Sequence, residues 1–170
     1  MKKPNHYSNR RSFLKKSVAA SSFFIVPRFV LGGSGYTAPS DKLSIASIGC
    51  GGKGSSDISH ASVNGRENVV ALCDIHPTGD HGVVSIRKKF PKAKFYTDFR
   101  ELLTQEKGLD AVTISTPDHT HGIIAKTAME KNIHVYVQKP LTHNIREARL
   151  LTELAREKKV VTQMGNQGAS

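Results

Sequence analysis

The chain has 170 residues, of which 25 are Lys or Arg and 14 are Asp or Glu, so its formal net charge is +11. Seven basic residues and no acidic residue lie in residues 1–40, which leaves 18 basic and 14 acidic residues in residues 41–170. The length corresponds to about one domain. The remaining charge of +4, without a run of five like charges, argues against a nucleic-acid-binding surface.

The first forty residues have the composition of an export signal. Residues 9–16 read Asn-Arg-Arg-Ser-Phe-Leu-Lys-Lys, and the pair Arg10-Arg11 followed by Phe13-Leu14-Lys15 is typical of a twin-arginine signal. The apolar stretch 18–26 is much shorter than the roughly 20 residues of a membrane-spanning helix. Residues 32–40, rich in Gly, Ser and Pro, indicate a linker. We therefore predict a signal and linker in residues 1–40, recognition by the twin-arginine export machinery, a periplasmic location and no stable membrane anchor.

Short apolar runs and amphipathic stretches alternate through residues 41–170. We expect strands at 43–48, 68–73, 94–96, 111–115, 134–137 and 160–163. Between them we expect helices at 52–62, 79–90, 99–105 and 119–131, and a helix that begins at 145. Asn144 and Glu147 form a cap at the start of this last helix. Apolar strands separated by helices imply parallel βαβ units. The predicted fold class is therefore α/β, with an open, doubly wound parallel sheet that binds ligands at the carboxyl ends of its strands.

The two cysteines, Cys50 and Cys73, each follow or end a predicted strand. Two are too few for a disulfide framework, and the sequence contains no Cys-x-x-Cys pair. We expect both thiols to be free and buried.

A glycine-rich turn between the first strand and the first helix matches the dinucleotide-binding pattern G-x-G-x-x-G. Residues 49–54 read Gly-Cys-Gly-Gly-Lys-Gly, with the matching glycines at 49, 51 and 54. Gly49 permits the tight turn, Gly51 lets the backbone approach a diphosphate, and Gly54 lets the helix lie close to the sheet. The exposed N–H groups of the turn, including that of Gly52, and the positive end of the helix would hold the diphosphate.

An acidic residue follows at the spacing that this pattern requires. Asp74 lies 20 residues after Gly54, at the end of the second predicted strand. A carboxylate there accepts hydrogen bonds from the ribose hydroxyls of an adenosine and repels a 2′-phosphate, so the predicted cofactor is NAD rather than NADP. The alternative is that Asp74 only forms the turn before His76 and Pro77.

Two further motifs follow buried strands. Residues 115–121 read Ser-Thr-Pro-Asp-His-Thr-His, and residues 137–140 read Val-Gln-Lys-Pro. With the glycine turn and Asp74, these motifs make residues 41–168 similar to the glucose-fructose oxidoreductase, inositol dehydrogenase and rhizopine-catabolism family (Gfo/Idh/MocA), whose members often carry Thr-Pro-Asn-x-x-His and Glu-Lys-Pro at these places. The sequence departs from this pattern at Asp118 and Gln138, which stand where Asn and Glu are common.

The motif residues are our candidates for contact with the cofactor. Ser115, Thr116 and Pro117 leave a buried strand beside the expected cofactor channel, where their backbone groups can reach the nicotinamide ribose or the diphosphate. We also expect His121 and Gln138 at the cofactor.

The resemblance implies that Lys139 contacts the nicotinamide ribose and the substrate hydroxyl. An ammonium group there would promote loss of the hydroxyl proton or stabilise an alkoxide during hydride transfer. Gln138, a neutral amide, cannot form an ion pair with this lysine. His119 and His121 are two residues apart on a helix and point to different faces, so no metal site is predicted.

The family resemblance implies an NAD(P)-dependent oxidoreductase that acts on a sugar or polyol by hydride transfer to or from nicotinamide. Two alternatives stay open: an NAD-dependent glycosidase that works through transient oxidation at C3 and elimination, and a non-catalytic dinucleotide-binding module. Family members continue with a second domain that supplies the substrate pocket. We therefore expect residues 41–170 to be the dinucleotide-binding domain of a truncated chain, inactive by itself, and leave open a homo-oligomer of the full-length protein.

Overall fold

The computed structural model describes residues 37–63, 65–79 and 81–166. The predicted twin-arginine motif, the apolar stretch that follows it and most of the predicted linker lie outside the described residues, as do residues 167–170. The fold belongs to a compact unit of residues 40–170. No helix in the described part of the chain has the length and apolar character needed to cross a membrane.

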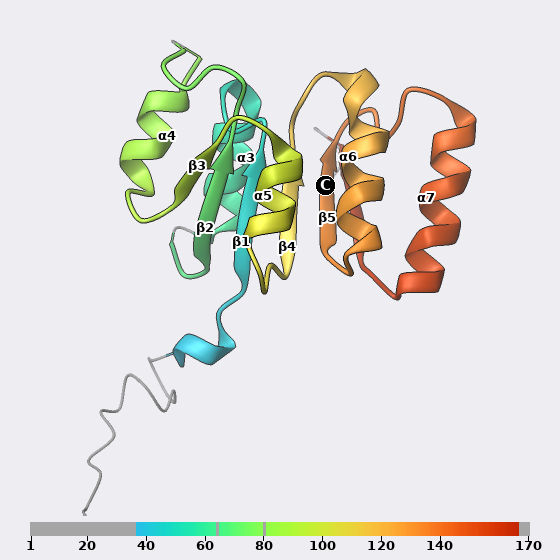
Figure 1. The fold of residues 1–170 in the computed structure, drawn as a ribbon, viewed down its shortest axis with the longest axis horizontal. Helices are drawn as coiled ribbons and strands as arrows, with labels where there is room; N and C mark the ends of the chain where they lie inside the picture. Colours follow the sequence, from blue (N-terminus) through green and yellow to red (C-terminus); the bar gives the residue numbers. More distant parts are fainter. Residues whose placement is uncertain (1–36, 64, 80, 167–170) are drawn as a thin grey trace, which may run out of the picture. The chain divides into compact units, whose positions relative to one another are not determined.

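Strands and helices alternate after a short 3-10 helix at Pro39–Asp41. The strands are β1 (Ser44–Ile48), β2 (Asn68–Cys73), β3 (Lys94–Tyr96), β4 (Ala111–Ile114), β5 (His134–Gln138) and β6 (Thr162–Gly165). The helices are α3 (Gly52–Ala61), α4 (Val83–Lys89), α5 (Phe99–Gln105), α6 (Asp118–Glu130) and α7 (Ile145–Lys158). All neighbouring strands are parallel, in the order β3-β2-β1-β4-β5-β6, which confirms the predicted doubly wound α/β sheet (Figure 1).

Apolar side chains on the two faces of the sheet build two cores. On one face, Ile48 and Ile114 belong to a cluster with residues of α5, α6 and α7, among them Met129. On the other face, Ile45 clusters with Ile58 of α3 and with residues of α4. Because successive side chains of a strand point to opposite faces, a sheet covered on both sides needs apolar residues throughout its strands. Figure 1 shows α5 and α6 in front of the sheet and α3 behind it.

Most predicted boundaries agree with the structure to within one residue, and β2, β3 and α5 agree at both ends. The predicted cap of α7 is also present. The Asn144 side chain accepts a hydrogen bond from the N–H of Glu147 (2.9 Å), and the Glu147 carboxylate accepts one from the N–H of His143 (3.0 Å).

The helix predicted at 79–90 begins later, at Val83. Gly82 has a φ of +87°, in the left-handed region, and a right-handed helix cannot run through such a residue. Before it, the N–H of Gly79 donates to the carbonyl of His76 (3.2 Å) in an irregular turn. The local backbone therefore overrides the helical propensity of this segment.

The last strand also begins later than predicted, at Thr162 instead of Val160, and ends at Gly165. Lys159, with a φ of +54°, ends α7 in the left-handed conformation, and the N–H of Val160 donates back to a carbonyl of that helix (3.2 Å). The N–H of Val161 donates to the ring of His134 (2.9 Å). Because these two N–H groups are already engaged, regular pairing with β5 starts only at Thr162.

One half-buried polar contact links β3 to the end of α5. The hydroxyl of Tyr96 and the ammonium of Lys94 both donate to the carboxylate of Glu106, the latter at 2.9 Å. Burial by itself raises the pKa of Glu106, but the hydrogen bonds from Tyr96 and Lys94 outweigh it and leave this pKa below its ordinary value. The hydrogen bond to Glu106, together with burial, raises the pKa of Tyr96 to about 12.

Replacing Tyr96 by Phe should lower the free energy of unfolding by about 1.5 kcal/mol at neutral pH, because a hydrogen bond to a charged group is lost. A carboxyl group with a lowered folded-state pKa stabilises the fold above its unfolded pKa and loses this effect as the pH falls through the folded-state pKa. The difference between the two proteins in urea unfolding should therefore shrink when neutral pH is replaced by acid pH. A difference that stays constant across this range would contradict the assignment.

Candidate functional site

The predicted site residues meet at one edge of the sheet. β1 lies between β2 and β4, so the chain proceeds in opposite directions along the sheet on either side of β1. In open parallel sheets, ligands bind at such a switch point, outside the carboxyl ends of the strands. Gly49, Asp74 and Ser115 directly follow β1, β2 and β4, and Gln138 is the last residue of β5.

The glycine turn lies in direct backbone contact with the end of β4. Gly49 has a φ of +76°, and a Cβ on it would lie 2.7 Å from the carbonyl oxygen of Ser115. A Cβ on Gly54 would lie 1.8 Å from the carbonyl oxygen of Gly49 and 3.1 Å from the Cβ of Ser115. Both positions require glycine, Gly49 for the turn and Gly54 for the close approach of α3 to the sheet.

Two N–H groups of the turn are already bonded to protein oxygens. The N–H of Gly51 donates to the carboxylate of Asp74 (3.0 Å), and the N–H of Gly52 donates to the carbonyl of His81, in the segment between β2 and α4. The other oxygen of the Asp74 carboxylate accepts from the N–H of His76 (3.1 Å). The expectation that these N–H groups point freely into the site is therefore not met at Gly51 and Gly52.

A cavity of about 680 Å³ opens beside the turn, within the range of roughly 300–1,000 Å³ that is common for small-molecule sites. Six predicted residues line it: Gly49, Gly51, Asp74, Ser115, Thr116 and Pro117. The other predicted residues lie outside this lining: Gly52, Gly54, His121, Gln138 and Lys139. The cavity thus brings together the turn, the acid after β2 and the exit of β4, which are the parts that an adenosine diphosphate moiety needs.

Sequence reasoning missed the wall of the cavity formed by the residues after β3. Thr97, Asp98, Phe99 and Arg100 line it. The Arg100 guanidinium lies over the Phe99 ring, 4.5 Å from its centre, which is close enough for a cation–π contact. The Asp98 carboxylate caps α5 by accepting from the N–H of Arg100 (2.8 Å). No local sequence signal marks this wall, because it arises from the packing of β3 beside β2 in the sheet.

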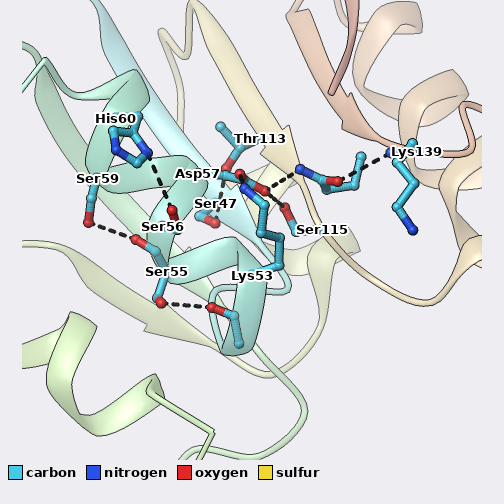
Figure 2. Close-up of polar contacts among 12 residues, drawn as sticks. Ser47, Lys53, Ser55, Ser56, Asp57, Ser59, His60, Thr113, Ser115 and Lys139 are labelled. Carbon is cyan, nitrogen blue, oxygen red and sulfur yellow. Dashed lines mark hydrogen bonds and ion pairs between the residues drawn. The ribbon is translucent and has the colours of Figure 1, made fainter. Parts of the chain in front are cut away.

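A buried carboxylate on α3 connects the turn to the ends of β4 and β5. Asp57 is 6% exposed and forms an ion pair with Lys53, one helical turn earlier. One of its oxygens also accepts from the Ser115 hydroxyl (2.8 Å) and from the Gln138 side-chain amide (2.8 Å). Figure 2 shows Lys53 and Ser115 converging on Asp57. Asp57 was not predicted from the sequence, because a lone acid in a helix carries no recognisable signal.

His121 is buried and does not line the cavity. It is 1% exposed, and its two ring nitrogens lie 2.7 Å from the backbone carbonyls of Thr116 and Pro140. His121 therefore packs against the residues after β4 and the turn after β5, and its ring is enclosed by protein. Lys139 itself is exposed, and its N–H donates to the side-chain oxygen of Gln138 (3.3 Å).

The two cysteines are free and buried, as predicted. Burial raises the pKa of each thiol to about 12, and the nearby Asp74 carboxylate adds to this effect for Cys50. Thiols that stay protonated are poor nucleophiles and poor metal ligands. Within the ranges that the structure describes, no three His, Cys, Asp or Glu side chains are grouped so that they could hold a metal ion.

Several known proteins resemble this chain. A family described as "Oxidoreductase family, NAD-binding Rossmann fold" (GFO_IDH_MocA) matches residues 43–166. An alpha-N-acetylgalactosaminidase of Shewanella oneidensis is 29% identical over 167 residues, which cover 84% of this chain and 36% of that protein. A scyllo-inositol 2-dehydrogenase (NAD(+)) of Bacillus subtilis is 38% identical over 72 residues, which cover 42% of this chain and 21% of that protein.

Among solved structures, GenD2 from gentamicin A biosynthesis, in complex with NAD, has a TM-score of 0.65 and 26% identity. The match covers 83% of this chain and 37% of GenD2. The chain therefore spans little more than a third of the length of the galactosaminidase and of GenD2.

The residues present fit a bound NAD. Glycines 49, 51 and 54 keep the turn free of side chains, the cavity lies against this turn, and the Asp74 carboxylate stands at the cavity wall. These features agree with the match over residues 43–166. The chain belongs to the Gfo/Idh/MocA oxidoreductase family and carries its NAD-binding Rossmann domain.

Proposed function

We propose that this chain is the cofactor-binding part of an oxidoreductase that transfers a hydride between a secondary carbinol carbon of a sugar or cyclic polyol and NAD. The observation that carries the proposal is the cavity bounded by the glycine turn, Asp74 and the exit of β4. The Bacillus subtilis relative is an inositol dehydrogenase by name, which supports a polyol-like substrate. The proposal assigns substrate binding mainly to residues outside this domain.

In this proposal, each part of the site has one task. The glycine turn and the start of α3 hold the diphosphate, and Asp74 accepts hydrogen bonds from the adenosine ribose. Bound nicotinamide supplies the acceptor or donor of the hydride. Lys139, exposed and directly after β5, contacts the nicotinamide ribose and donates a hydrogen bond to the substrate oxygen. Its charge stabilises the negative charge that develops on that oxygen.

A second candidate is glycoside cleavage without net consumption of NAD. The Shewanella oneidensis relative is an alpha-N-acetylgalactosaminidase, and other relatives are glycosyl hydrolase family 109 proteins of Shewanella. In this reaction a sugar hydroxyl is oxidised, the glycosidic group is eliminated, water adds and the hydride returns to the sugar. The same cofactor site serves both reactions, so they differ in net products rather than in this domain. A non-catalytic binding module would bind NAD and turn over neither kind of substrate.

We also propose that the protein is exported through the twin-arginine route, on the basis of Arg10-Arg11 and the short apolar stretch that follows. A protein exported in folded form can carry its cofactor with it. We therefore propose that NAD binds before export and stays bound.

The cofactor preference can be tested by titration of the purified protein. Wild type should bind NAD more tightly than NADP, and Asp74→Ala should lose about tenfold in NAD affinity, or ~1.4 kcal/mol. Asp74→Asn is the matched control, because it keeps an acceptor for the Gly51 N–H while it removes the charge that repels a 2′-phosphate. A wild-type preference for NADP would refute the role of Asp74.

The reaction type can be tested on the full-length protein, because residues 41–170 are expected to be inactive by themselves. It is assayed with sugars, polyols and nitrophenyl glycosides, recording NADH formation and nitrophenol release in parallel. The leading proposal predicts net NADH, and the second candidate predicts nitrophenol without net NADH. Lys139→Met should lower kcat by about a hundredfold in either case, through loss of charge stabilisation. Lys107→Met, an exposed lysine in the turn before β4, is the control and should leave kcat unchanged. NAD binding without turnover of any of these compounds would favour the non-catalytic module.

Export can be tested by replacing Arg10-Arg11 with Lys-Lys and fractionating the cells. The variant should accumulate in the cytoplasm, because the twin-arginine machinery recognises the arginine pair. Replacing Lys2-Lys3 with Arg-Arg is the control and should leave export intact. Unchanged export of the Lys-Lys variant would refute the signal assignment.

A further inference from the structure

The buried carboxylate of Asp57 requires hydrogen-bond donors from its neighbours. An ionised carboxylate is a hydrogen-bond acceptor only, and leaving it buried without donors is costly. Its donors are Lys53 on α3, Ser115 after β4 and Gln138 at the end of β5. Asp57 therefore joins three segments that sequence order separates, at the point where the predicted cofactor site is built.

The side chain at position 138 is constrained by this carboxylate. Gln138 is 6% exposed, and its amide nitrogen lies 2.8 Å from Asp57. A Cβ on Gly165 would lie 2.9 Å from the same nitrogen, so β6 encloses the amide from another side. A glutamate at this position would place two buried carboxylates within hydrogen-bond distance, where like charges cannot both remain ionised without a large cost.

The oxygen of the same Gln138 amide group contacts the backbone of Lys139. The Gln138 carbonyl oxygen accepts from the Lys139 N–H (3.3 Å), and the carbonyl of Pro140 is held by His121 (2.7 Å). Lys139 thus lies between two residues with fixed partners, one tied to α3 and the other to α6. Because its neighbours on both sides have fixed contacts, the backbone of Lys139 has a defined position although its side chain is exposed.

We propose that Asp57 is a positioning residue that sets the place of Lys139 through Gln138, and that Asp57 and Gln138 are a matched pair. In this chain, the carboxylate that fixes the turn after β5 comes from α3 and not from the residue before the lysine. The role given to Lys139 rests on the proposed function, whereas the pairing of Asp57 with Gln138 does not.

The pairing can be tested with Gln138→Glu, Asp57→Asn and the double variant, in thermal unfolding of the purified protein. Gln138→Glu should lower Tm by at least about 5 °C, because two carboxylates then meet in a buried place. The double variant should recover most of this loss, because the amide introduced by Asp57→Asn can donate to the new glutamate. If Gln138→Glu does not fold, recovery of folded protein in the double variant supports the pairing, and failure of the double variant to fold overturns it.

The positioning of Lys139 can be tested by NADH titration of the same variants. Gln138→Glu should weaken NADH binding by at least about tenfold, with rescue in the double variant. In a Lys139→Met background, Gln138→Glu should still lower Tm but should no longer weaken NADH binding. Thr113→Val, which removes a buried hydrogen bond to Ser47 (3.0 Å) elsewhere in the sheet, is the control and should lower Tm without changing NADH affinity.

The outcomes separate this inference from the proposed function. Additive effects on Tm, or an equal loss of NADH affinity with and without Lys139, would overturn the inference while the unmodified protein still binds NADH. If the unmodified protein binds no NADH, the proposed function fails, and the positioning of Lys139 fails with it.

Discussion

The site depends on a backbone contact between the β1–α3 turn and the end of β4. No side chain fits between these segments, since a Cβ on Gly49 would lie 2.7 Å from the Ser115 carbonyl and one on Gly54 would lie 1.8 Å from the Gly49 carbonyl. This contact lets α3 begin directly at the sheet edge, so that its positive end and the turn face the same space. The cavity lies beside this contact, where a Cβ on Gly51 would approach the Asp74 carboxylate to 3.1 Å.

Two carboxylates near this contact have different environments and therefore different tasks. Asp57 is buried, and its donors Lys53, Ser115 and Gln138 belong to the protein, which suits it to hold α3, β4 and β5 together. Asp74 lines the cavity and accepts from two backbone N–H groups, one in the glycine turn and one in the loop after β2. A carboxylate offers about four lone-pair sites, so Asp74 can accept further bonds from a ligand.

A protein carbonyl already accepts a hydrogen bond from an N–H group of the glycine turn that a ligand could use. The His81 carbonyl accepts the Gly52 N–H, and the Gly82 that follows has a φ of +87°. A diphosphate that binds the Gly52 N–H must displace this carbonyl. The residues just before α4 therefore contact the glycine turn, which lies between β1 and α3.

The sequence by itself determined the features whose causes are local. Apolar periodicity predicted the strands and helices, the glycine spacing predicted the turn, and Asn144 with Glu147 predicted the start of α7, because backbone geometry and neighbouring side chains decide each of them. The predicted start of β6 was wrong because N–H groups of Val160 and Val161 bond to other protein groups. The predicted start of α4 was wrong because Gly82 has a left-handed conformation. Only the tertiary structure decided the strand order, the wall after β3, the burial of His121 and the role of Asp57. Asp57 lies 58 residues from Ser115 and 81 from Gln138, so no local pattern connects them, and only the packing of α3 on the sheet brings them within 2.8 Å.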